Sequence, residues 1–85
     1  MAYRKALLLS ESEFREMCKA IRGGLRGKVS RVGLWYYVID VLESMARSEG
    51  VDGFFIWRKE VGWNMYSIED TAILVMDYFG YKLET

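Results

Sequence analysis

Few side chains in this 85-residue sequence are of the kinds that catalysis or metal binding requires. Histidine, the usual general base and a common zinc ligand, is absent, and Cys18 is the single cysteine. Cys18 shares its apolar stripe with Met17 and Ile21, which favours a buried core thiol over a reactive one. We therefore expect no enzymatic activity, no metal site and no cofactor.

The carboxylates occur where helices ordinarily have them. Asp40 and Glu43 fall on the polar face of one expected helix, and Glu69 and Asp70 fall in the first turn of another. We interpret both pairs as solvated surface groups rather than as an acid and a base that act together.

The most specific pattern is a basic segment that glycines interrupt. Residues 15–31 have six Lys or Arg residues and one acidic residue, a net charge of +5, whereas residues 60–85 have one cation and five acids, a net charge of −4. Such a separation of charge favours a polyanionic partner, and nucleic acid is the leading candidate. The expected anion-binding residues are Lys19, Arg22, Arg26, Lys28, Ser30 and Arg31.

The glycines of this segment strengthen the hypothesis. Three of them lie between Arg22 and Lys28, where they let the backbone approach a phosphate. Ser30 is the expected N-cap of the following helix, whose N-terminus favours an anion. The segment is not a nucleotide-binding P-loop, because Arg22 stands five residues before Gly27, where that motif has glycine. The alternative is a solvated face whose charges pair within the molecule or across a dimer.

Aromatic residues are concentrated in a second segment. Phe54, Phe55, Trp57, Trp63 and Tyr66 belong to two β-prone runs that predict a hairpin. Aromatic side chains on a sheet can stack unpaired bases. Alternation along the strands places some of them on each face, so we favour a core on one face and a protein interface on the other. The expected interaction surface consists of Trp57, Trp63 and Tyr66.

Hydrophobic periodicity predicts the elements that position these residues. We expect one α+β domain over residues 1–85, with the order βααββαβ, three helices and a short antiparallel hairpin. The expected elements are a strand over 2–9, a helix from Ser10 or Ser12 to Gly23-Gly24, a helix from Ser30 to Gly50, a hairpin over 54–66, a helix from Ser67 to Gly80 and an edge strand over 81–83.

The composition indicates the assembly and the compartment. Hydrophobic residues make up 52% of the chain and aromatic residues 15%, more than one small monomer readily buries, so we expect a homodimer. A single cysteine indicates a reducing compartment, and no apolar run approaches the ~18 residues of a membrane span. We expect a cytoplasmic protein without a membrane segment. Scarce amide residues are a trait of proteins from hot environments, although five methionines count against such an origin.

The spacing in the first 50 residues resembles that of a known family. Ser30-Arg31 precedes the paired apolar positions Leu34-Trp35 and Val38-Ile39, and Phe14, Met17 and Ile21 match the spacing of a preceding helix. This pattern resembles the ribbon-helix-helix DNA-binding proteins, in which a strand and two helices intertwine as a dimer. The strand departs from that pattern, because only Arg4 among its outward residues could read a base edge. The resemblance implies a dimeric repressor whose second-helix N-terminus holds DNA phosphates.

Two functions remain open at this point. The first is a small dimeric DNA-binding regulator, with phosphate contacts from residues 19–31. The second is an interaction module, such as an adaptor, an inhibitor or an antitoxin-like protein, that acts through the aromatic hairpin and the acidic third helix. The salt dependence of nucleic-acid binding separates the two.

Overall fold

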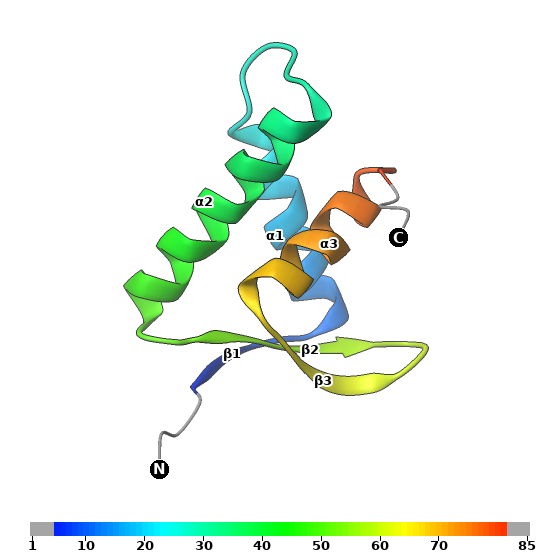
Figure 1. Cartoon of the computed structure of the whole chain (residues 1–85). Helices are drawn as coiled ribbons and strands as arrows, with labels where there is room; N and C mark the ends of the chain where they lie inside the picture. Colours follow the sequence, from blue (N-terminus) through cyan, green and yellow to red (C-terminus); the bar gives the residue numbers. More distant parts are fainter. Residues whose placement is uncertain (1–4, 82–85) are drawn as a thin grey trace.

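Three helices lie on one side of a three-stranded sheet (Figure 1). The computed structural model describes residues 5–81. Its elements are β1 (Ala6–Leu9), α1 (Glu11–Gly23), α2 (Arg31–Glu49), β2 (Gly53–Arg58), β3 (Gly62–Tyr66) and α3 (Ile68–Tyr78). The predicted α+β class, the three helices and the antiparallel hairpin are confirmed. The predicted edge strand over 81–83 lies outside the described residues, except for Tyr81, which is not part of a strand.

The sheet has the order β1-β2-β3, with β2 in the centre. β1 and β2 are parallel, because the two helices α1 and α2 carry the chain back across the sheet between them. β2 and β3 form the hairpin, in which Trp57 pairs with Trp63. Gly53 begins β2, and a Cβ there would lie 2.6 Å from the carbonyl oxygen of Tyr66. Only glycine therefore lets the start of β2 approach the end of β3 this closely.

A serine caps the N-terminus of each helix, and all three serines were predicted caps. The Oγ atoms of Ser10, Ser30 and Ser67 accept hydrogen bonds from the backbone N–H groups three residues further on. At α1 the cap is Ser10 rather than Ser12, and the Glu13 carboxylate accepts a hydrogen bond from the Ser10 N–H in return. These hydrogen bonds lower the pKa of Glu13. Local sequence thus determines where the helices begin.

One hydrophobic core joins the helices to the covered face of the sheet. The sheet contributes Leu9, Phe54 and Ile56, all buried. The buried apolar residues that the helices contribute to this core are Met17, Cys18, Ile21, Leu34, Val38, Leu42, Ala72, Val75 and Met76. The phenol of Tyr37 on α2 donates a hydrogen bond of 2.7 Å to the carbonyl oxygen of Ile21, near the end of α1. This contact ties together the two helices that flank the basic segment.

Candidate functional site

The predicted basic residues lie at one end of the molecule, which we call the basic end and define as Lys19, Arg22, Arg26, Lys28 and Arg31. These residues belong to the last turns of α1, the connection over 24–30 and the first turn of α2. Figure 1 shows this connection at the end of the helical layer away from the sheet. All five side chains are exposed. No acidic residue occurs from Met17 to Ile39, so Glu16 and Asp40 are the acids nearest to the basic end in the sequence.

The five cations differ in their partners. The Lys19 ammonium lies 3.7 Å from the Glu16 carboxylate, an exposed pair of the kind that contributes little to stability. The Arg22 guanidinium lies 5.7 Å from the centre of the Phe79 ring, just beyond α3. Because α3 has no basic residue in its last turn, Arg22 also brings a cation to the negative end of that helix dipole.

Arg26 and Lys28 are the most available cations of the basic end. Within residues 5–81 neither forms an ion pair or a hydrogen bond through its side chain. Leu25 packs against the core and its N–H bonds to the Arg22 carbonyl at 3.1 Å, which anchors the start of the connection. Gly27 has a φ of 73°, a conformation that favours glycine, and it turns the chain between the two cations.

Ser30 is the N-cap of α2. Its Oγ accepts the Gly33 N–H at 3.0 Å, so this oxygen is already engaged in the cap. The first turn of α2 has no acidic residue, whereas the first turns of α1 and α3 have two each. The positive end of the α2 dipole is therefore not neutralised from within its own helix, and it adds to the charge of the basic end.

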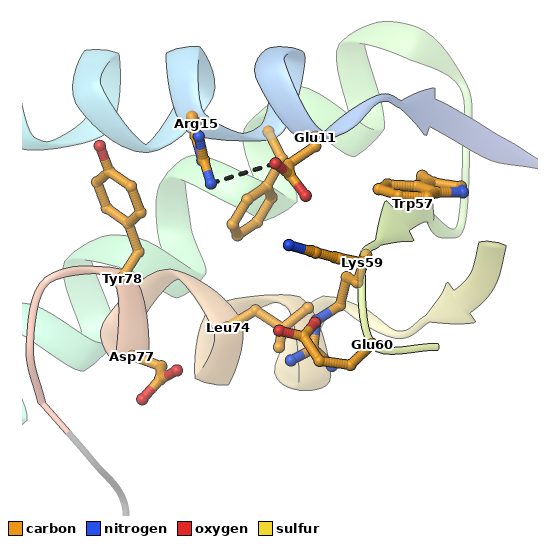
Figure 2. A pocket seen from close by; sticks show the side chains of 10 residues that line it. Glu11, Arg15, Trp57, Lys59, Glu60, Leu74, Asp77 and Tyr78 are labelled. Carbon is orange, nitrogen blue, oxygen red and sulfur yellow. Dashed lines mark ion pairs between the residues drawn. The ribbon is translucent and has the colours of Figure 1, made fainter. Parts of the chain in front are cut away.

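The aromatic residues predicted as an interaction surface do not all share a face. Trp57 and Trp63 are paired across the hairpin, at positions that the register places on the side of the sheet away from the helices. Trp57, which lies beyond the end of β1, also lines the hollow between α1, the hairpin turn and α3 (Figure 2). Tyr66 pairs with the buried Phe54 on the helix side. There its hydroxyl accepts a hydrogen bond from Arg58 Nη1 at 3.4 Å, which raises the pKa of Arg58.

The side of the sheet that the helices leave uncovered is apolar. We call it the open sheet face and define it as Leu8, Phe55, Trp57, Trp63 and Met65, which the register places on one side. Leu8 is 61% exposed, Trp63 45%, Met65 37% and Trp57 36%. The rings of Phe55 and Trp63 stack with centroids 5.3 Å apart and planes inclined by 13°. Leu8, Phe55 and Met65 were not part of the predicted interaction surface. Leu8 joins it through the parallel pairing of β1 with β2, whereas Phe55 and Met65 join it by alternation along the hairpin.

Other kinds of site would need an accessible thiol, grouped acidic residues or a membrane-spanning helix in the part of the chain that the structure describes. Cys18 is fully buried, and its burial raises the pKa of its thiol to about 12, so it stays protonated at neutral pH. Between residues 5 and 81 no three His, Cys, Asp or Glu side chains are grouped so that they could hold a metal ion. No helix in the same range is long and apolar enough to cross a membrane.

A hollow between α1, the hairpin turn and α3 brings charges of both signs together (Figure 2). The Arg15 guanidinium pairs with the Glu11 carboxylate at 3.2 Å at its rim. The other charged residues that line it are Arg58, Lys59, Glu60 and Asp77. Its volume of about 240 Å³ is below that of ordinary small-molecule sites, and its cations and acids are equal in number. It therefore favours no particular ligand.

The chain thus has two candidate binding surfaces, the basic end and the open sheet face, which lie apart from each other (Figure 1). Comparison with protein-family models, with curated proteins and with solved structures finds no match to this chain. The ribbon-helix-helix resemblance stays a prediction. In the structure β1, the strand that this resemblance would pair with a second copy, pairs with β2 of its own chain.

Proposed function

We propose that the protein is a small, non-catalytic regulator that binds DNA through phosphate contacts from the basic end. The observation that carries this proposal is the charge at that end. Five exposed cations lie along a stretch of 23 residues, Met17 to Ile39, that contains no acid. Contacts between such cations and DNA phosphates supply a large share of the affinity and fix the orientation of a protein on DNA, without reading its sequence.

Each part of the basic end has a role in this proposal. Arg26 and Lys28, which have no competing partner among the described residues, contact the phosphates directly. Lys19, Arg22 and Arg31 flank them and extend the positive field along the helices. Ser30 holds the start of α2 in place, so that the N-terminus of this helix adds its dipole to the contact.

The salt dependence of binding tests this proposal. Affinity for duplex DNA should fall steeply with salt, because each neutralised phosphate releases condensed counterions. The double variant Arg26→Ala/Lys28→Ala should flatten the slope of log K against log salt by up to roughly two units, since each phosphate contact accounts for about 0.9. The matched control is Arg47→Ala/Lys59→Ala, which removes the same charge from exposed positions outside the basic end. The control should keep most of the parental slope.

The second candidate function is a protein interaction module. The observation that favours it is the open sheet face, which would bind a partner independently of the basic end. The acidic residues of α3 support it less, because Glu69 and Asp70 stand in the first turn, where they stabilise the helix itself. A folded protein that fails to bind duplex DNA, single-stranded DNA and RNA at low salt would favour this module over the DNA-binding regulator.

A further inference from the structure

The open sheet face has a composition that sets it apart from the rest of the surface. The strand positions on this side are Ala6, Leu8, Gly53, Phe55, Trp57, Trp63 and Met65. None of them is charged or polar. A sheet that packs on one side ordinarily alternates apolar residues on that side with polar residues on the other, whereas here the strand residues of the uncovered side are apolar too. A sheet that is apolar on both sides is typical of one that is covered on both.

We infer that the open sheet face is the interface of a homodimer in which the sheets of two copies pack face to face. This inference does not depend on the proposed binding of DNA. In such a dimer the two sheets lie about 10 Å apart, with strand directions within about 30° of each other. The helices form the outer layers. A two-fold axis brings the same residues of both chains together, so the face must be complementary to itself.

The absence of charge makes the open sheet face complementary to itself. A charged residue near a two-fold axis would meet its own copy and repel it, and within residues 5–81 no strand residue of this face is charged. The lack of cations among these strand residues also argues against nucleic-acid bases stacking on this face. Proteins that stack the bases of a single strand bind its phosphate backbone with nearby cations. The nearest strand cation, Arg58, has its guanidinium on the helix side with Tyr66.

The area of the face fits a weak dimer. The exposed parts of its side chains amount to roughly 400 Å² per chain, taking full side-chain areas on the order of 150–250 Å². Two copies would bury about 800 Å² from these residues, which lies at the low end of the areas found in protein interfaces and fits a weak, reversible dimer. We therefore expect a dissociation constant on the order of micromolar.

Mass and tryptophan fluorescence, measured over the same concentration series, test this inference together. The parent should pass from the mass of one chain to twice that mass across the micromolar range. Trp63 stacks on Phe55 in the open sheet face and is 45% exposed, so its emission should shift to shorter wavelengths as the dimer forms and water leaves it. Pairing through the free edge of β1 or β3 would leave this ring in water and produce no such shift.

Two variants locate the interface. Trp63→Lys and Leu8→Lys each place a charge on the face from a different strand, and each should raise the dissociation constant by roughly tenfold or more. The control is Tyr36→Lys, which replaces a 63%-exposed aromatic residue on α2, outside the face, and should dimerise as the parent does. Far-ultraviolet circular dichroism and a cooperative melt establish that each variant is folded.

Several outcomes would overturn the inference. One is a single-chain mass at every concentration, and another is a dimer that forms without the emission shift. Unchanged dimerisation of folded Trp63→Lys and Leu8→Lys would place the interface elsewhere. A monomer whose tryptophan emission is quenched by single-stranded oligonucleotide would assign the face to base stacking instead. Should both variants fail to fold, the mass and emission of the parent decide the question.

Discussion

Replacing Tyr37 by phenylalanine tests how the basic end is held in place. The phenol of Tyr37 donates a 2.7 Å hydrogen bond to the carbonyl oxygen of Ile21 and so joins α2 to the end of α1. The same oxygen also accepts the Gly24 N–H at 3.2 Å. Loss of the phenol would therefore remove one hydrogen bond without leaving a buried acceptor unsatisfied. We expect the free energy of unfolding to fall by about 1 kcal/mol, the net value of one such bond.

Tyr36→Phe is the matched control for this substitution. Tyr36 is the neighbouring residue, is 63% exposed and forms no hydrogen bond through its hydroxyl to residues 5–81. Its substitution should change the free energy of unfolding by less than about 0.5 kcal/mol. For a domain of this size the loss in Tyr37→Phe corresponds to a fall in Tm of about 4–8 °C. Urea unfolding and thermal melting of the three proteins measure both quantities.

Hydrogen exchange adds a local readout. Since Tyr37 holds the end of α1, the amides around Gly24 and Leu25 should exchange faster in Tyr37→Phe, while those of the hairpin should change less. Equal stability of Tyr37→Phe and Tyr36→Phe would refute this reasoning. So would faster exchange spread evenly over the whole chain.

Three further predictions concern chemistry, packing and the relation between the two surfaces. Because burial raises the pKa of Cys18 to about 12, a thiol reagent should label the native protein far more slowly than the unfolded protein, and rapid labelling would contradict its burial. Gly53→Ala should destabilise the fold by about 1–3 kcal/mol in urea unfolding, because its Cβ would collide with the Tyr66 carbonyl. Gly23→Ala, which meets nothing within 4 Å, should not destabilise it. At protein concentrations well below the micromolar range, where the parent is also a single chain, Trp63→Lys should keep at least the parental salt slope for duplex DNA, since the open sheet face lies apart from the basic end; a flatter slope there would contradict this.

The helices could be predicted because their signals are local. Ser10, Ser30 and Ser67 each accept the N–H of a residue three positions later, so a short stretch of sequence determines each cap. The hairpin was also predictable from its two β-prone runs. Alternation could even have separated Trp63 from Tyr66, because residues three apart in a strand face opposite sides.

The remaining features depend on contacts between distant parts of the chain. The parallel pairing of Leu8 with Phe55 places Leu8 on the open sheet face, and nothing near Leu8 in the sequence indicates that register. The contact between Arg22 and Phe79 likewise joins residues from α1 and the end of α3. The charge of the basic segment predicts that it is exposed. That no described acid pairs with Arg26 or Lys28 could be learned only from the positions of those acids in the fold.

The salt dependence of duplex binding tests the central claim most directly. Fluorescence anisotropy with labelled duplexes of several sequences would give the slope of log K against log salt for the parent, Arg26→Ala/Lys28→Ala and Arg47→Ala/Lys59→Ala. We expect a steep slope for the parent, a slope flatter by up to roughly two units for the first variant, and a slope close to the parental one for the second. The loss should be similar for every duplex sequence, because phosphate contacts read no bases. Equal binding by the parent and folded Arg26→Ala/Lys28→Ala at every salt concentration, or no binding by the parent at low salt, would contradict the claim.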